Sequence, residues 1–217
     1  MITTTIESSR SSASRQADTA ERSPRLGVLV VGADGWLRDR VCELLEAEAG
    51  FRLAGVAGHT EEARSMAERE RFDIAVVAHR PPAESGFEAC CELRRTPTPP
   101  AVVICCAKPD GMLAASCAVA DADALVSMHD CAAEWAGMLD RVARGVRFLP
   151  AVPPGVGAML RDHLDAAQYA VFDMLLAGFP AAEVAAALRM PETELETRRS
   201  ELLKRLEALP PARGAGY

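Results

Sequence analysis

The sequence predicts an α/β protein with two parts: a five-stranded, doubly wound parallel sheet, followed by a small all-α domain. Two observations support this. From Leu26 to about Arg144, apolar runs too short for helices alternate with segments whose apolar residues recur at helical spacing. After a stretch rich in proline and glycine, every strong pattern is helical. Such an alternation is typical of strand–helix units, whose parallel strands are buried on both faces.

The strands and helices of the first part follow one another at regular intervals. Most of the apolar runs are bounded by glycine, proline or aspartate, which favour turns. The expected strands are Leu26–Val31, Phe51–Ala57, Asp73–Ala78, Ala101–Cys106 and Asp123–Ser127. The expected helices are Trp36–Ala49, Glu61–Arg71, Glu84–Arg95, Gly111–Val119 and Cys131–Arg144. The last helix carries four candidates for the core or for a dimer face: Trp135, Met138, Leu139 and Val142.

We expect four regions along the chain. Residues 1–24 are rich in serine and threonine and lack the apolar segment of a secretory signal, so they are expected to be a disordered tail. Residues 25–144 form the α/β domain, and residues 145–158, rich in proline and glycine, form a linker. Residues 159–217 form the all-α domain, with helices expected at Leu164–Ala177, Ala181–Leu188 and Glu192–Leu209.

The composition excludes several classes of protein. With 49% hydrophobic and 25% charged residues, the chain is too apolar for a disordered protein. It has no uncharged apolar run of about 18 residues, so no membrane span is expected. The net charge of −7 requires any contact with nucleic acid to come from a local patch. Without an export signal we expect a cytoplasmic protein, whose seven cysteines are mostly buried thiols rather than redox or zinc sites.

The last three helices, with a tight turn before the final one, have the pattern of a helix-turn-helix. Leu164 opens the first helix and Gly178 ends it, Glu183–Val184–Ala185 matches an E-I-A motif, and Leu195 stands where the recognition helix carries valine. This part resembles a LuxR-type helix-turn-helix. The whole segment from Arg25 to about Leu209 resembles a response regulator of the NarL/FixJ type, in which a receiver precedes that module.

The resemblance implies a phosphorylation site whose residues this sequence lacks. Receivers of this family hold Mg²⁺ with acidic residues after the first strand and phosphorylate an aspartate after the third. They also carry a hydroxyl after the fourth strand and a lysine after the fifth. Alanine cannot be phosphorylated, and glycine and alanine cannot hold magnesium, so we expect a pseudo-receiver that works without phosphorylation, metal or cofactor. The expected degenerate pocket comprises Gly32, Ala33, Asp34, Ala78, His79, Cys106 and Met128. Of these, His79 is expected in a solvated loop, with an anion contact as the alternative.

The resemblance also implies double-stranded promoter DNA as a partner. The residues expected to contact it are Arg189, Thr193, Glu196, Thr197, Arg198, Arg199, Ser200, Lys204 and Arg205. Two features weaken the expectation. Glu196 stands where the family usually has a base-reading lysine, and residues 151–217 hold more acidic than basic side chains. The alternative is a regulatory adaptor that acts through protein–protein contacts.

Atypical regulators of this kind are similar to orphan, pathway-specific regulators of antibiotic biosynthesis, some of which sense pathway products. Members of the NarL/FixJ-type family often dimerise through receiver helices, so the resemblance also implies a homodimer formed through the receiver-like domain. A small-molecule effector in the degenerate pocket is also open, because this pocket should be less polar than the pocket of a working receiver. The alternative is that these substitutions only fill space and stabilise a constitutive dimer. The sequence shows no paired carboxylates, metal set or nucleophile–base pair, so we do not expect an enzyme.

Overall fold

The computed structural model describes residues 25–33, 35–47, 50–130 and 132–209. The predicted tail 1–24 and Asp34 lie outside the described residues. Five parallel strands form one sheet in the order β2-β1-β3-β4-β5. This confirms the doubly wound parallel sheet. The strands are β1 (Leu26–Val31), β2 (Phe51–Ala57), β3 (Ile74–Ala78), β4 (Ala101–Cys106) and β5 (Ala124–Ser127).

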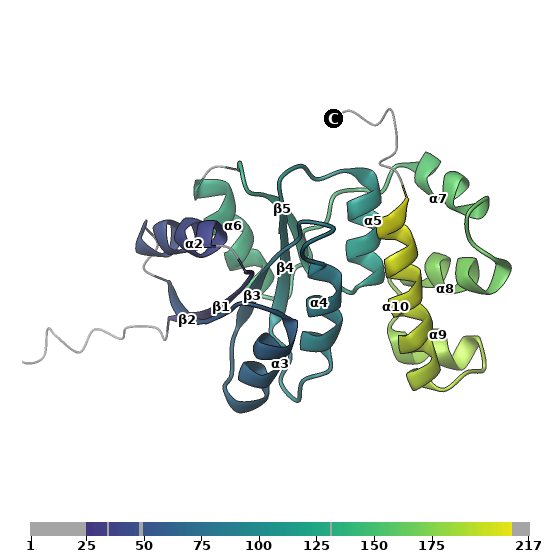
Figure 1. The fold of residues 1–217 in the computed structure, drawn as a ribbon, viewed down its shortest axis with the longest axis horizontal. Coiled ribbons are helices and arrows are strands. Elements are labelled where there is room, and N and C mark those ends of the chain that lie inside the picture. The colour runs from purple at the N-terminus through teal and green to yellow at the C-terminus, as the bar shows by residue number, and fades with distance from the viewer. Residues whose placement is uncertain (1–24, 34, 48–49, 131, 210–217) are drawn as a thin grey trace, which may run out of the picture.

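Helices cover both faces of the sheet (Figure 1). On one face lie α2 (Gly35–Ala47) and α6 (Ala132–Ala143). On the other lie α3 (Thr60–Arg69), α4 (Gly86–Arg94) and α5 (Gly111–Val119). Because successive side chains of a strand point to opposite faces, each layer of helices buries its own apolar cluster.

The four apolar residues of α6 are core residues rather than a dimer face. Trp135, Met138, Leu139 and Val142 are each exposed by 3% or less and pack against β3, β5 and α2. The indole N–H of Trp135 also donates a hydrogen bond to the carbonyl oxygen of Ser127, at 3.2 Å. A homodimer therefore needs a different surface from these four side chains.

Four helices follow the sheet: α7 (Pro154–Arg161), α8 (Ala166–Leu176), α9 (Ala181–Ala187) and α10 (Glu192–Ala208). Helix α7 was not predicted, and it begins inside the range expected to be a linker. Proline is compatible with the first turn of a helix, where its missing N–H would have no partner. Pro154 begins the helix, and Val156 and Leu160, one turn apart, are buried. The segment that does link the two domains therefore ends at Pro153.

The helical domain packs against the α/β domain. In Figure 1 it lies beside α5, and α8 and α10 both contact that helix, while α10 also contacts α4. The apolar side chains of both domains form one continuous buried cluster across this contact. At its edge, the linker residue Pro153 approaches Gly111 so closely that a Cβ on Gly111 would lie 2.6 Å from the proline Cδ. We refer to this packing as the docked arrangement.

Candidate functional site

A cavity of about 230 Å³ opens where β1 and β3 end, at the position expected for the degenerate pocket. Gly32, Ala33 and Ala78 line it. A Cβ placed on Gly32 would lie 3.0 Å from the Cβ of Ala78, so the two strand ends are in close contact. The structure thus brings these three predicted residues together, and none of them can accept a phosphoryl group or hold a metal ion.

A carboxylate reaches this cavity from the loop between β3 and α4. One oxygen of Glu84 accepts a hydrogen bond from the backbone N–H of Ala33. The other accepts from Nε and Nη2 of Arg80, at 3.0 and 2.8 Å. The guanidinium of Arg80 in turn lies 5.9 Å from the ring centre of Trp36. Because Arg80 neutralises it, Glu84 does not replace the acidic pair with which a receiver holds magnesium.

The remaining predicted pocket residues lie elsewhere. His79 is 3% exposed, with its ring centre 4.3 Å from that of Phe87, and its Nδ1 accepts a hydrogen bond from the Gly86 N–H at 3.3 Å. The expectation of a solvated loop was therefore wrong for His79, because its ring packs against α4. Cys106 belongs to the apolar cluster on the α3–α5 side and Met128 packs against the cluster on the α2–α6 side, so neither lines the cavity.

Burial controls the charge of His79. It lowers the pKa of the imidazole from 6.5 to about 4, although Asp110 acts in the opposite direction. The approach of Nδ1 to Oε1 of Glu207, at 3.8 Å, is therefore not an ion pair at neutral pH. Burial also raises the pKa of the Glu207 carboxyl, while a hydrogen bond from Ser85 lowers it.

The depressed pKa of His79 should make the protein sensitive to acid. Between pH 6.5 and 4 the unfolded chain binds a proton that the folded state excludes. The free energy of unfolding therefore decreases as the pH is lowered through this range, by about 3 kcal/mol from this group. Urea denaturation across this range should show a shallower fall for His79→Gln than for the unmodified protein. His163→Gln, at an exposed histidine, is the control. Parallel curves for the protein and His79→Gln would contradict this assignment.

The buried cysteines behave as apolar groups, as expected. Cys90, Cys91, Cys105, Cys106 and Cys117 are free thiols, exposed by 3% or less. Burial raises the pKa of Cys106 to about 12 and raises those of the other four as well. Since the thiolate is the reactive form, these side chains are poor redox or metal-binding groups. Among the described residues, no three His, Cys, Asp or Glu side chains are grouped so as to hold a metal ion.

Several polar residues of the cavity were not predicted. His59, Glu84, Ser85 and Glu88 also line it, so it is more polar than Gly32, Ala33 and Ala78 alone suggest. A signal was present for two of them: Ser85 and Glu88 have the S-x-x-E spacing that marks a helix N-terminus. The Ser85 oxygen caps α4 by accepting from the Glu88 N–H at 3.4 Å, and its hydroxyl donates to Glu207 of α10 at 2.6 Å.

The residues predicted to contact DNA lie on two sides of α10 and the turn before it. One group faces solvent, and its members are exposed apart from the half-buried Arg198, which pairs with Glu194 at 2.7 Å. This group comprises Arg189, Thr193, Thr197, Arg198, Lys204 and Arg205. The second group comprises Glu196, Arg199 and Ser200, which are buried or half-buried beside the α/β domain.

One member of the second group, Glu196, makes a polar contact across the docked arrangement. Glu196 accepts hydrogen bonds from Arg95 at 3.1 Å and from Arg199 at 2.6 Å. Arg199 is 4% exposed, and its Nε has no hydrogen-bond partner among the described residues. Ser200 and Lys204 line a cavity of about 300 Å³ between α4 and α10. In this arrangement Arg199 is out of reach of a DNA duplex.

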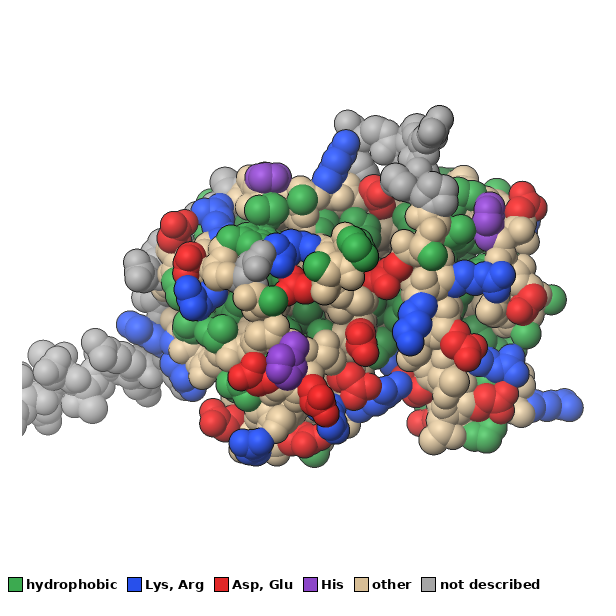
Figure 2. Space-filling model, in the orientation of Figure 1, with side chains coloured by type: hydrophobic (Ala, Val, Ile, Leu, Met, Phe, Trp, Pro, Cys, Tyr) green, Lys and Arg blue, Asp and Glu red, His purple; other side chains and the backbone are tan. Residues whose placement is uncertain are grey.

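The surface of the helical domain carries mixed charge. On the face shown in Figure 2, Lys and Arg side chains over the C-terminal helices are interspersed with Asp and Glu rather than gathered into one basic patch. The first turn of α10 is itself acidic, with Glu192 and Glu194. Acidic groups favour a helix N-terminus through its dipole, but they repel DNA phosphates. None of the described helices is long and apolar enough to cross a membrane.

No protein-family model and no curated protein matches this sequence. Solved structures do match the fold. RcsB from Salmonella typhimurium is 10% identical to this chain and superposes with a TM-score of 0.52. The alignment covers 84% of this chain and 92% of RcsB. RcsB solved in complex with DNA matches at 0.53, with 10% identity over 86% of this chain and 94% of that one. The chain has the fold of a response regulator.

Two further structures support this conclusion. A LuxR-family two-component response regulator from Aurantimonas sp. SI85-9A1 is 19% identical, with 64% of this chain covering 97% of that one at a TM-score of 0.53. The signal receiver domain of NarL from Mycobacterium tuberculosis is 17% identical, with 56% of this chain covering 98% of that one at 0.51. The α/β domain is thus receiver-like, and the all-α domain corresponds to the C-terminal part of a full-length response regulator.

Proposed function

We propose that this protein is a cytoplasmic, DNA-binding transcriptional regulator that works without phosphorylation. The observation that carries the proposal is Ala78 at the end of β3, in contact with Gly32 at the end of β1, inside a response-regulator fold. The positions that would accept a phosphoryl group and hold magnesium are small and apolar. The resemblance to orphan regulators extends the proposal to control of a pathway-specific gene cluster, which genome-wide mapping of bound DNA would test. It also extends the proposal to a homodimer, which sedimentation analysis would test.

The solvent-facing side of α10 supports DNA binding. Thr193 and Thr197 are exposed, and the Thr197 hydroxyl donates a hydrogen bond to the Thr193 carbonyl at 3.0 Å. Lys204 is also exposed, although it lines the cavity between α4 and α10, and it has no ion-pair partner among the described residues. Arg205 nearby is exposed and donates a hydrogen bond to Gln168 of α8 at 2.7 Å. RcsB, whose fold this chain shares, has been solved bound to DNA. Hydroxyl and basic side chains along one side of a helix can contact both base edges and phosphates in a major groove.

The docked arrangement limits that contact. Glu196, Arg199 and Ser200 belong to the same helix but lie against α4, so a duplex can reach all of α10 only after the two domains separate. The protein then exists as docked and open forms, and its affinity for DNA is reduced by the fraction that is docked.

A fluorescence anisotropy titration with DNA from upstream of the protein's own gene tests DNA binding. We expect log affinity to fall linearly with log salt concentration. Lys204→Ala should weaken binding about five- to tenfold and reduce the salt slope by about one. Lys108→Ala is the matched control, since Lys108 is an exposed lysine of the receiver-like domain. Binding that is insensitive to salt, or equal losses in both variants, would contradict the proposal.

A regulatory adaptor is the second candidate, favoured by the acidic first turn of α10 and by the burial of Arg199. It predicts no salt-dependent DNA binding, and capture of a protein partner instead.

An effector in the degenerate pocket is the third candidate. The cavity has about 230 Å³, and Ser85 lies between it and Glu207 of α10, so an occupant would act on the docked arrangement.

A further inference from the structure

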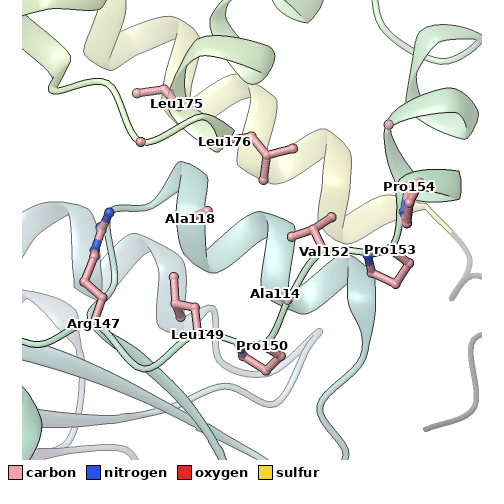
Figure 3. A pocket seen from close by; sticks show the side chains of 12 residues that line it. Ala114, Ala118, Arg147, Leu149, Pro150, Val152, Pro153, Pro154, Leu175 and Leu176 are labelled. Atoms are coloured by element: carbon pink, nitrogen blue, oxygen red, sulfur yellow. The ribbon is translucent and has the colours of Figure 1, made fainter.

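At the junction of the two domains and the linker lies a larger cavity of about 460 Å³, which is open to solvent (Figure 3). Ala114 and Ala118 of α5 form one wall, Leu149 and Val152 of the linker another, and Leu176 of α8 faces them. A volume of this size is within the range of small-molecule sites, which are mostly apolar and have a few polar groups that orient the ligand. This cavity is separate from the degenerate pocket and shares no lining residue with it.

Rigid elements keep the cavity open. Phe148 pairs with β5 as an added parallel bridge, donating its N–H to the Asp123 carbonyl at 2.6 Å, which fixes the start of the linker. Prolines at 150, 153 and 154 then restrict the backbone along the wall. Gly178, also in the lining, has a φ of +86°, a conformation that other residues rarely adopt, so no larger side chain readily fills the space there.

Arg147 is the one charged side chain among the described residues that line this cavity, and the other lining residues are apolar or glycine. Arg147 stands at one end of it, with Pro153 and Pro154 at the other (Figure 3). Nη2 of Arg147 binds the exposed carboxylate of Asp121, while Nε and Nη1 have no hydrogen-bond partner among the described residues. A guanidinium has five N–H donors and binds carboxylates and similar anions through two parallel hydrogen bonds. Arg147 can therefore accept a second anion beside Asp121.

We propose that this interdomain cavity binds a small, largely apolar molecule that carries one anionic group, which Arg147 recognises. The apolar part lies between α5, the linker and Leu176, and the anion lies at the Arg147 end. Because the site is built from both domains, it exists only in the docked arrangement. The ligand therefore stabilises that arrangement and lowers the affinity for DNA, since it can shift the equilibrium only toward the form it binds.

A fluorescence titration with anilinonaphthalene sulfonate, an apolar anion that brightens in apolar sites, tests the binding site without DNA. We expect saturable binding of one probe per chain. Arg147→Gln should weaken it about tenfold by removing the charged pair. Ala118→Trp should abolish it by filling the cavity, with circular dichroism confirming that the variant is folded. Phenylnaphthylamine, which has the rings without the sulfonate, should bind more weakly and be unaffected by Arg147→Gln.

Asp121→Asn is the matched control, because it breaks the same ion pair while leaving the guanidinium in place. It should bind the probe as tightly as the unmodified protein or more tightly. Equal binding by all variants, or weakening by Asp121→Asn equal to that of Arg147→Gln, would overturn the proposal. So would loss in Ala118→Trp with no change in Arg147→Gln. Since these measurements contain no DNA, their outcome is independent of whether the protein proves to be a DNA-binding regulator.

Discussion

Alanine in place of Trp135 is expected to lower the free energy of unfolding by about 3–5 kcal/mol. Trp135 is among the largest fully buried side chains, at 1% exposure, and packs between α6 and the sheet. Its removal leaves a cavity where the indole ring lay. It also leaves the Ser127 carbonyl without the hydrogen bond that the indole N–H donates. Both effects act on the folding of the receiver-like domain, whatever the oligomeric state.

Urea denaturation followed by circular dichroism measures this loss, and sedimentation velocity measures assembly in the same samples. Arg144→Ala is the control, since the Arg144 side chain beyond the end of α6 is 72% exposed; it should change stability by less than about 0.5 kcal/mol. A Trp135→Ala variant that keeps its stability but dissociates from dimer to monomer would show that α6 presents a dimer face rather than a core face.

Alanine in place of Gly111 is expected to open the docked arrangement. The new Cβ would lie 2.6 Å from Cδ and 2.9 Å from Cγ of Pro153, and a proline ring cannot rotate away from the contact. The linker must shift, and α8 and α10 move with it. Overpacking of this kind costs about 1–3 kcal/mol, which shifts the balance between docked and open forms by about five- to 150-fold. Trypsin cleavage after Arg147 should accelerate accordingly, and DNA affinity should rise.

Gly137→Ala provides the matched control, because a Cβ on Gly137 in α6 meets no described atom within 4 Å apart from the backbone of its own helix. Alanine is also favoured over glycine in a helix interior, so this variant should be stabilised by about 0.5–1 kcal/mol without any change in the linker. Equal cleavage rates in the two variants would show that the Gly111–Pro153 contact does not hold the domains together.

Local patterns were sufficient to predict most of the fold. The bounds of β1, β2 and β4 match the expected strands, because short apolar runs between turn-forming residues leave little ambiguity. The same patterns located Gly32, Ala33 and Ala78 at one edge of the sheet, since parallel strands present their carboxyl ends together. The sequence was therefore sufficient to predict that small, apolar residues stand at the ends of β1 and β3.

Features that depend on contacts between distant segments could not be predicted. His79 directly follows a strand, so the sequence predicts a loop residue, but α4 packs over its ring. Arg199 has the spacing of a DNA-contacting residue, but docking of α10 on α4 buries it. Glu84 enters the degenerate pocket because its own loop folds back, with paired backbone hydrogen bonds to Arg80. None of these arrangements leaves a periodic signal in the sequence.

The proposed function depends above all on DNA binding that is independent of phosphorylation. A direct experiment incubates the protein with acetyl phosphate and magnesium, then measures its intact mass and its affinity for promoter DNA. A receiver that retains its aspartate and magnesium-binding carboxylates, treated in parallel, is the positive control. We expect no mass gain and an unchanged dissociation constant, because Ala78 offers no acceptor. Gain of one phosphoryl group together with a change in affinity for DNA would show that the protein is a phosphorylation-dependent regulator after all.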